Sequence, residues 1–511
     1  MHGFYSVDIT IGEEGLPYLI EINGSNSGFD GFFIAYGDTS ILDAIISGFE
    51  ELAGHRDVFV VTRLVNFGEL PPDYLEKLPQ DLLYFRSVKN VHATLSGGIT
   101  GRTWARTRTD MPPSGREAPT SLDALVQRCS RFKKVMLNVA DPSYVIPDQY
   151  FREWPEAGVI SFKEDVAGVV EAIPLRDQDV LWIRCPTVAF SAPITKGIQM
   201  NPEFPYDALA DNKLFTYEVL SPVFPNNVPV SIPIGNRCSG SKAIGDGLDC
   251  SSGDLFVRKP VLGSQARGIE ILRTQDMRDY MSRIAQLEQA EHQGLEELPL
   301  ELRGVPELVA AWALSFDVSL ASEIRLSKPV YCRRTGRYHH GCMRSLALVK
   351  EDDNGTVSVR FLGAYWRLAP IPIDGDGLLW ERYVASQSQG SFCEAVSSDD
   401  IAVAQRFSTD VLTAYCQRLA AMPTNRKDYQ RWEEEYWLAR YREQVPFLRY
   451  EKAWNKFLAR LGTAKREALQ LKQQAELSGF RRVPSVLFGR EELARSNLPF
   501  LIQEPHRIVV T

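Results

Sequence analysis

Short apolar runs alternate with helical stretches between residues 57 and 200. Runs of four or five apolar residues with polar segments on both sides are typical of strands that are buried in a sheet. Such runs occur at 58–61, 135–139, 159–162 and 180–183. Because they alternate with helical patterns, they predict an α/β layer whose sheet is largely parallel.

The segments before and after this region have different patterns. Residues 1–56 contain two strand-like runs around a turn at 13–15, followed by a helical pattern at 40–52. Residues 201–420 have a mixed α+β pattern, interrupted at 236–254 by a segment rich in Gly, Ser and Asp. No internal repeat and no low-complexity tract is present.

The last ninety residues are strongly helical in pattern. Residues 426–480 are dense in Glu, Lys, Arg, Gln and Ala. Four apolar residues in this segment have the i, i+3, i+4, i+7 spacing of an amphipathic helix: Trp454, Phe457, Leu458 and Leu461. The pattern predicts a C-terminal helical extension that packs on the body of the protein, with a partner-binding coiled coil as the alternative.

The composition is that of an ordinary globular protein, with 44% apolar and 24% charged residues. At about 150 residues per domain, the length of 511 residues suggests about three domains or one large multi-lobed unit. The net charge of −8, without a long basic stripe, argues against nucleic acid and membrane surfaces as partners. No apolar run is long enough to span a membrane and no targeting signal opens the chain, so we expect a cytoplasmic protein. The eight cysteines include no CxxC pair and are expected to be reduced thiols.

Polar residues interrupt the second strand-like run near the N-terminus. Glu21 and Asn23 are two positions apart and so lie on the same face of a strand, where Asp8 on the preceding strand is placed to join them. Two carboxylates and an amide oxygen suit Mg²⁺ that is held together with phosphates. A surface hairpin with solvated side chains is the alternative. However, Glu21 stands within the core-like run 19–22, where an unpaired carboxylate is costly.

A strand-like run at 255–260 carries Lys259 near its end, and glycines follow at 263 and 268. This arrangement offers an ammonium group and free backbone N–H groups to a polyphosphate. The segment is not a Walker A motif, because no G-x-x-x-x-G-K-[ST] occurs. An ordinary hairpin turn is the alternative.

Further candidate cations follow along the chain. Lys213 comes early in a helix that we expect Asp211 to cap. Arg344 and Arg367 each end an apolar or aromatic stretch, where a guanidinium group usually needs an anionic partner. The alternatives are a capped surface helix for Lys213 and structural salt bridges for the two arginines.

These pieces together resemble the ATP-grasp superfamily of carboxylate–amine ligases. In that family a helix start with Lys, a Val-x-Lys-Pro strand with a Gly-rich loop, and two Arg residues follow one another. The matching residues here are Lys213, Lys259, the loop 263–268, Arg344 and Arg367. The family's closing motif, an Asp on one strand and Glu-x-Asn on the next, resembles Asp8, Glu21 and Asn23.

The resemblance implies cofactors and residue roles. ATP and Mg²⁺ would be bound, with Asp8, Glu21 and Asn23 as the metal ligands. The nucleotide would be held by Lys213, Lys259, Gly263, Ser264, Gly268 and Glu323, with Glu307 as the alternative ribose ligand. Arg344 and Arg367 would be catalytic, because their charge would stabilise an acyl phosphate.

The order of the motifs differs from a standard ATP-grasp protein, since the closing motif stands at the N-terminus. We therefore expect a circularly permuted ATP-grasp fold, whose N-terminal hairpin lies beside the strand of Lys259. A remnant of a tandem protein, with Met1 as an internal start, is the alternative. The expected domains are the metal-binding end of the ATP-grasp fold at 1–56, a small preceding α/β domain at 57–204, the nucleotide-binding portion at 205–420 and the helical extension at 421–511.

The expected activity is the ATP-dependent joining of a small carboxylate to a small amine through an acyl phosphate. Two other interpretations stay open at this point. One is a non-catalytic ATP-grasp-like binding or scaffold protein. The other is a zinc site, because suitable ligand types occur at Cys332, His339, His340 and Cys342, although their spacing fits no known zinc motif.

Overall fold

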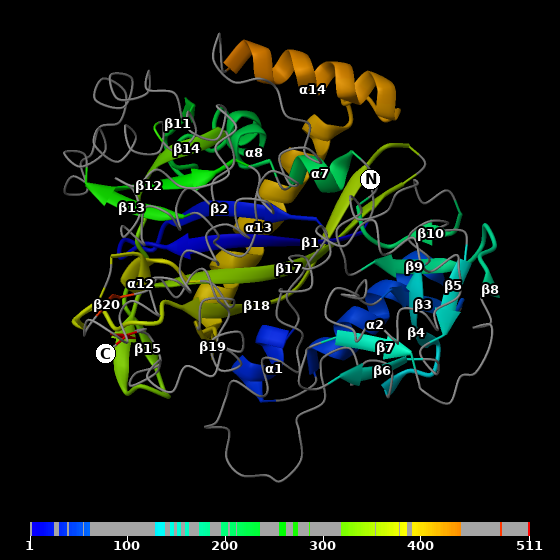
Figure 1. Cartoon of the computed structure of the whole chain (residues 1–511), viewed down its shortest axis with the longest axis horizontal. Coiled ribbons are helices and arrows are strands. Elements are labelled where there is room, and N and C mark those ends of the chain that lie inside the picture. Colours follow the sequence, from blue (N-terminus) through cyan, green and yellow to red (C-terminus); the bar gives the residue numbers. More distant parts are fainter. Residues whose placement is uncertain are drawn as a thin grey trace. The chain divides into compact units, whose positions relative to one another are not determined.

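The computed structural model describes about half of the chain (Figure 1). The described residues are 3–24, 30–37, 40–54, 56–61, 128–137, 144–147, 151–154, 159–162, 173–183, 196–202, 205–210, 212–235, 255–261, 269–273, 286, 318–352, 354–377, 379–385, 391–440, 481–482 and 509–510. The glycine loop at 263–268 and the amphipathic pattern around Trp454 lie outside them.

Two compact units make up the chain. Unit 1 consists of Met1–Ser6, Asn23–Glu203 and Leu346–Gly363, and unit 2 of Val7–Ile22, Phe204–Ser345 and Ala364–Thr511. The domain boundaries expected after residues 56, 204 and 420 stay predictions.

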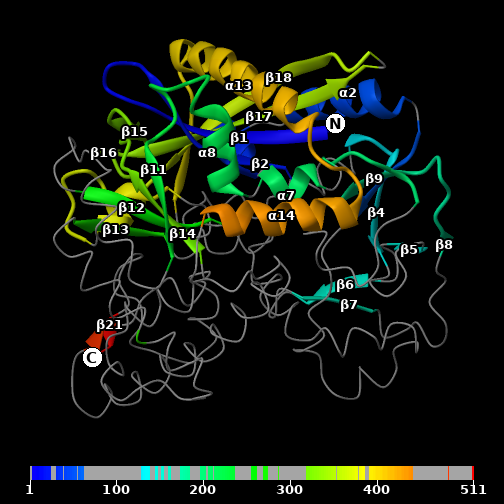
Figure 2. The same ribbon diagram turned by 90° about the horizontal axis from the view of Figure 1, so that it is seen from above.

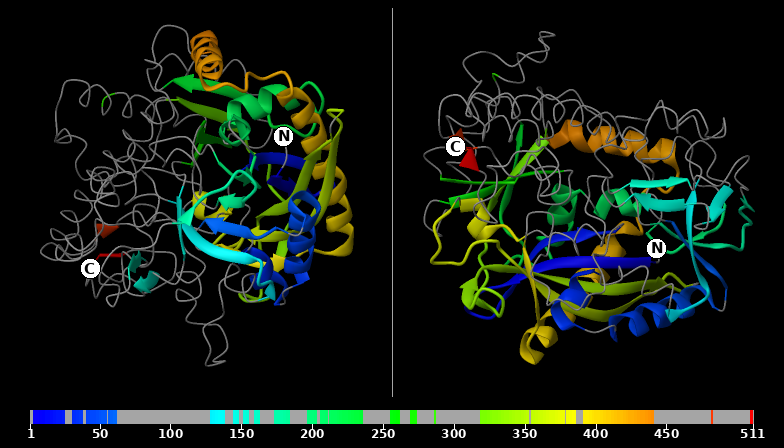
Figure 3. Two further views of the ribbon diagram at one scale, coloured as in Figure 1. Left: turned by 90° about the vertical axis from the view of Figure 1, so that its right-hand side faces the viewer. Right: turned by 60° about the horizontal axis from the view of Figure 1, so that its bottom comes forward.

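A five-stranded sheet includes the N-terminal hairpin that the sequence predicts. The hairpin strands are β1 (Gly3–Ile11) and β2 (Pro17–Asn23), joined by a turn in which Gly15 has a positive φ of 80°, a conformation that favours glycine. The other strands are β17 (Gly341–Glu351), β18 (Val357–Leu368) and β19 (Phe392–Ala395). The order is β19-β18-β17-β1-β2, and the right-hand view of Figure 3 shows the blue hairpin beside the yellow-green strands. The N-terminal hairpin thus completes a sheet whose remaining strands begin at Gly341.

Unit 1 contains a six-stranded sheet in the order β10-β9-β3-β4-β5-β8. Its strands are β3 (Val58–Val61), β4 (Phe132–Leu137), β5 (Tyr144–Pro147), β8 (Ile173–Pro174), β9 (Val180–Ile183) and β10 (Ile198–Gln199). Neighbours from β10 through β9 and β3 to β4 are parallel, whereas β5 and β8 pair antiparallel at one edge. The largely parallel sheet expected for this region is confirmed. The apolar run at 159–162 is not part of it, because β7 (Val159–Phe162) pairs with β6 (Phe151–Trp154) in a separate two-stranded sheet.

The helices of unit 1 include α1 (Asp30–Tyr36) and α2 (Ser40–Ala53). The apolar face of α2 packs on the six-stranded sheet. Its Phe49 ring lies 5.1 Å from the ring of Phe132 on β4 and 5.0 Å from Trp182 on β9, measured between centroids. Aromatic contacts of this kind bury large apolar areas and fix the helix against the strands.

Unit 2 contains an antiparallel sheet in the order β11-β14-β12-β13. Its strands are β11 (Ser231–Gly235), β12 (Leu255–Pro260), β13 (Glu270–Arg273) and β14 (Val318–Glu323). Two helices precede it, α7 (Tyr206–Ala210) and α8 (Lys213–Leu220). The N-cap of α8 is Asn212, whose side-chain oxygen accepts a hydrogen bond from the Phe215 amide at 3.0 Å. The expected cap at Asp211 is therefore wrong by one residue, because both types cap well and the local sequence does not choose between them.

The smaller elements of unit 2 complete the described part. They are the hairpin of β15 (Val330–Cys332) with β16 (Arg337–His339), helix α12 (Leu379–Tyr383), and the pair β20 (Arg481–Arg482) and β21 (Val509–Val510).

Two long helices follow β19. Helix α13 (Ser398–Leu419) is capped by Ser397 and crosses one face of the five-stranded sheet (Figures 1 and 2). The hydroxyls of Ser408 on α13 and Ser345 on β17 are 2.6 Å apart. Helix α14 (Arg426–Arg440) is the described start of the predicted helical extension. Its Trp432 ring packs against Phe215 of α8 at 5.6 Å between centroids. Within the described residues, no helix has the length and apolar character that a membrane crossing requires.

Candidate functional site

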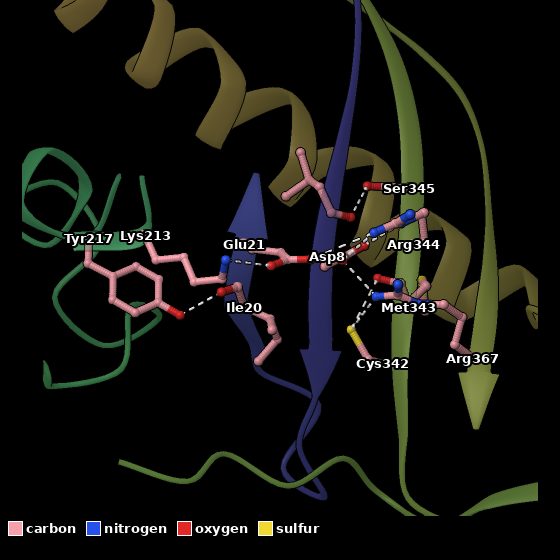
Figure 4. A network of polar contacts seen from close by, with 11 residues as sticks. Asp8, Ile20, Glu21, Lys213, Tyr217, Cys342, Met343, Arg344, Ser345 and Arg367 are labelled. Atoms are coloured by element: carbon pink, nitrogen blue, oxygen red, sulfur yellow. Dashed lines mark hydrogen bonds and ion pairs between the residues drawn. The ribbon is translucent and has the colours of Figure 1, made fainter. Parts of the chain in front are cut away.

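Charged side chains form a row across four neighbouring strands of the five-stranded sheet (Figure 4). From β2 to β18 the row consists of Glu21, Asp8, Arg344 and Arg367, and Lys213 of α8 adjoins Glu21. All five residues belong to unit 2. We call them the charged row. Side chains on adjacent strands meet in this way when they project from the same face of the sheet.

Asp8 is the centre of the row and is completely buried. Its Oδ1 accepts a hydrogen bond from Arg344 Nε at 2.8 Å, and its Oδ2 accepts from Arg344 Nη2 at 2.7 Å. Oδ2 also lies 2.7 Å from Arg367 Nη2. Burial alone would raise the pKa of Asp8, but the charges of Arg344 and Arg367 outweigh it and hold the pKa well below its ordinary value. Asp8 is therefore a permanent carboxylate between two guanidinium groups.

Glu21 links this centre to the helix. Its Oε1 lies 3.7 Å from Arg344 Nη2, and its Oε2 lies 3.4 Å from Lys213 Nζ. The side chain is 19% exposed, so this carboxylate is more accessible than that of Asp8. Asn23, the third expected metal ligand, is the last residue of β2 and follows Glu21 by two positions.

Lys259 approaches the row from β12. Its side chain is buried, its ammonium group donates a hydrogen bond to the hydroxyl of Tyr217, and its Nζ lies 4.6 Å from the centroid of that ring. The Tyr217 hydroxyl in turn donates to the Ile20 carbonyl at 2.5 Å. Burial lowers the pKa of Lys259 to about 7, with the charge of Lys213 adding to the effect and Glu21 opposing it. The expected juxtaposition of the N-terminal hairpin with the Lys259 strand is thus present.

One expected nucleotide ligand stands apart from the charged row. Glu323 is the last residue of β14, opposite Phe256 of β12. Within the described part of the chain, its carboxylate is paired with Arg325 Nη2 at 2.6 Å rather than with the row. Gly263, Ser264 and Gly268 lie outside the described residues.

Two residues of the site were not expected there. Tyr217 follows Lys213 by one helical turn, so an i, i+4 rule would have placed it on the same helix face. Cys342 lies on β17 two positions before Arg344, and its Sγ accepts a hydrogen bond from Arg367 Nη2 at 3.3 Å. Burial raises the pKa of Cys342 to about 12, so it remains a thiol at neutral pH.

The residues considered as zinc ligands are not gathered around one point, and both histidines make hydrogen bonds elsewhere. His339 contacts the Ala369 carbonyl through Nδ1 and the Thr335 hydroxyl through Nε2, both at 2.8 Å. His340 Nδ1 instead lies 3.0 Å from the Ser327 carbonyl. In the described part of the chain, no three His, Cys, Asp or Glu residues are placed to hold a metal ion. A zinc site built from Cys332, His339, His340 and Cys342 is therefore wrong.

The charge balance of the row indicates which ligand it fits. Two carboxylates face three basic side chains, Lys213, Arg344 and Arg367, and Lys259 lies close by. Such a site attracts an anion with several oxygens, because guanidinium and ammonium groups are strong donors to phosphate. The carboxylates are suitable donors for Mg²⁺, but Asp8 already accepts from both arginines. Mg²⁺ therefore fits the site together with a polyphosphate, which supplies both negative charge and further oxygen ligands.

Comparisons with known proteins gave similarity at the level of structure. The sequence matches no protein-family model and no curated protein. The structure is similar to a putative gamma-glutamylcysteine synthetase from Methylobacillus flagellatus KT, with 11% identity, a TM-score of 0.40, and coverage of 81% of this chain and 87% of that one. It is also similar to D-alanyl-alanine synthetase A from Vibrio cholerae O1 biovar eltor, with 12% identity, a TM-score of 0.30, and coverage of 57% and 73%.

Proposed function

We propose that the protein is an ATP-dependent ligase that joins a small carboxylate to a small amine, with Mg²⁺ bound beside the nucleotide. The observation that carries this proposal is the convergence of Lys213, Lys259, Arg344 and Arg367 around two buried or half-buried carboxylates. Phosphoryl transfer depends mainly on positioning and on neutralising charge, and these residues supply both.

The residues have distinct roles in this proposal. Lys213 and Lys259 hold the phosphates of ATP. Lys213 Nζ lies 3.4 Å from Glu21, and Lys259 is linked through Tyr217 to the carbonyl of Ile20, the residue before Glu21. Arg344 and Arg367 stabilise the charge that develops on the transferred phosphoryl group. Glu21, Asn23 and Asp8 would hold Mg²⁺ through their oxygens, and the bound ion would neutralise phosphate charge.

The chemistry proceeds in two displacements. A carboxylate oxygen of the substrate forms a bond to the γ-phosphorus of ATP, the bond to the bridging oxygen breaks, and ADP leaves. The nitrogen of the amine then attacks the carbonyl carbon of the acyl phosphate, phosphate leaves with the electron pair, and the nitrogen releases a proton to solvent. Water competes with the amine in the second step, so the acyl phosphate must be shielded.

Glu323 remains our proposed ligand for the ribose of ATP. Its ion pair with Arg325 holds the carboxylate at the end of β14 in one orientation. A carboxylate held in one orientation is suited to accept hydrogen bonds from a ribose diol. Glu323→Gln tests this role, because it should weaken the binding of ATP and leave that of inorganic triphosphate unchanged.

The test is ADP release by the purified protein with Mg²⁺, measured across pairs of small carboxylates and amines. We expect release that requires both substrates, is abolished by EDTA, and falls at least tenfold in Lys259→Met. Lys350→Met is the matched control, because Lys350 is a half-exposed lysine whose Nζ lies 4.0 Å from Glu51 Oε1, outside the charged row. ATP binding without substrate-dependent ADP release would instead favour a non-catalytic binding protein.

A further inference from the structure

The amine of Lys259 depends on one side chain for its position. Within the described residues, its hydrogen-bond acceptor is the hydroxyl of Tyr217. Lys259 is only 6% exposed, so solvent does not replace this contact, and a buried ammonium group without an acceptor is costly. The lysine side chain has four rotatable bonds, and this contact selects one direction for its charge.

The hydroxyl of Tyr217 is itself fixed by the N-terminal hairpin. Its proton is directed to the Ile20 carbonyl at 2.5 Å, so its lone pairs remain for Lys259. Burial raises the pKa of Tyr217, which keeps this proton in place at neutral pH. Ile20 directly precedes Glu21, and Tyr217 therefore connects α8, β2 and β12 at one point.

The two lysines of the site would otherwise repel each other. The charge of Lys213 acts on Lys259, and the Lys213 amide donates to the Val261 carbonyl at 3.1 Å, which ties the start of α8 to the end of β12. With the backbones held together, Lys259 could lower the repulsion by turning away from Lys213. The bond to Tyr217 opposes this movement.

We propose that Tyr217 is a positioning residue that fixes the ammonium group of Lys259, so that Lys213 and Lys259 bind the same polyphosphate. The inference rests on the proposed function and adds a residue to it. Tyr217 need not touch the nucleotide, because it acts through Lys259. Its removal should therefore matter only while Lys259 is present.

A double-mutant cycle tests this dependence. ATP and inorganic triphosphate are titrated into the wild-type protein, Tyr217→Phe, Lys259→Met and the double variant. We expect Tyr217→Phe to weaken the binding of both ligands about tenfold, because a hydrogen bond to a charged group is lost. The binding of adenosine, which has no phosphate, should be unchanged. In the Lys259→Met background, Tyr217→Phe should have no further effect. A tenfold loss in both backgrounds, or none in either, would overturn the positioning role.

Tyr436→Phe is the matched control. Tyr436 is buried to a similar extent, and its hydroxyl donates to Glu218 Oε2 at 3.1 Å on the same helix α8. This variant should bind ATP like the wild type while its melting temperature falls as much as that of Tyr217→Phe. If Tyr217→Phe does not fold, Lys259→Arg tests the same contact. Arginine keeps the positive charge but is longer than lysine, so it places the charge beyond the Tyr217 hydroxyl. An ATP affinity equal to that of the wild type would then refute the inference. A wild-type protein that binds neither ATP nor triphosphate refutes the proposed function together with this inference, whereas binding with an additive cycle refutes only the inference.

Discussion

Replacing Asp8 with Asn should destabilise unit 2 more than any other single change of charge in the row. The substitution preserves shape but removes the negative charge between Arg344 and Arg367. Asp8 accepts three contacts at 2.7 to 2.8 Å from these guanidinium groups and is 0% exposed. An Asn side chain has one acceptor oxygen, and its amide N–H group would face donors. Breaking a buried ion pair by removing one partner costs about 3–5 kcal/mol, which is the loss we expect in the free energy of unfolding.

Asp43→Asn is a matched control, because Asp43 has the same bidentate geometry on the surface. Arg128 donates to its two oxygens from Nε at 2.9 Å and from Nη2 at 2.7 Å, but the Asp43 side chain is 64% exposed. Exposed ion pairs contribute about 0–1 kcal/mol, so this control should lose no more than that. Urea titration of both variants, followed by circular dichroism, measures the two losses. Equal losses below about 1 kcal/mol would refute the view that Asp8 neutralises buried cations.

The pH dependence gives a second check of the same contact. The folded-state pKa of Asp8 lies below its ordinary value of 3.8, so the stabilisation is fully present above pH 3.8 and is lost as the pH falls toward the folded-state pKa. The difference between the wild type and Asp8→Asn should therefore be constant from pH 7 to pH 5 and shrink at lower pH. A difference that grows on acidification would contradict the assignment.

Three further predictions concern ligands and reactivity. Because the pKa of Lys259 is lowered to about 7, ATP binding at pH 8 should take up a proton, and calorimetry in buffers of different ionisation enthalpy should show this uptake disappear in Lys259→Met. Mn²⁺, used as a paramagnetic substitute for Mg²⁺, should bind in the presence of ATP or triphosphate and at least tenfold more weakly without them, since the row already carries more positive than negative charge; equal binding without phosphate would contradict this charge balance. Cys342, whose pKa is raised to about 12, should react with iodoacetamide at pH 8 at least tenfold more slowly in the folded protein than in urea, as peptide mass spectrometry would measure.

Local sequence patterns predicted a large part of the fold. The alternation of apolar runs indicated the parallel strands β3, β4 and β9, because such runs need only local composition to be recognised. The i, i+2 spacing placed Glu21 and Asn23 on one strand, and the apolar surroundings indicated that Glu21 is not freely solvated. These inferences depend on residues that are close in the chain.

The pairings within the site could not be predicted in the same way. Asp8 and Arg344 are 336 positions apart, and no local pattern selects Arg344 over another cation as the partner of Asp8. Two local signals were nevertheless available. Tyr217 follows Lys213 by four positions in a helix, the spacing of neighbours on one helix face. Arg325 follows Glu323 by two positions, close enough in the chain for the ion pair that the structure contains.

Under the proposed function, Asp8 has two roles: it balances the charges of Arg344 and Arg367 before ATP binds, and it offers oxygens to Mg²⁺ afterwards. Without a ligand, Arg344 and Arg367 would repel each other across the sheet, and Asp8 offsets that repulsion by accepting from both. A triphosphate brings several negative charges beside the same guanidinium groups and takes over part of this role. The oxygens of Asp8 then become available to a metal ion, which in turn offsets the added phosphate charge. Under the proposed function, Arg344 and Arg367 are therefore kept buried and ordered before a nucleotide binds, because Asp8 balances their charge.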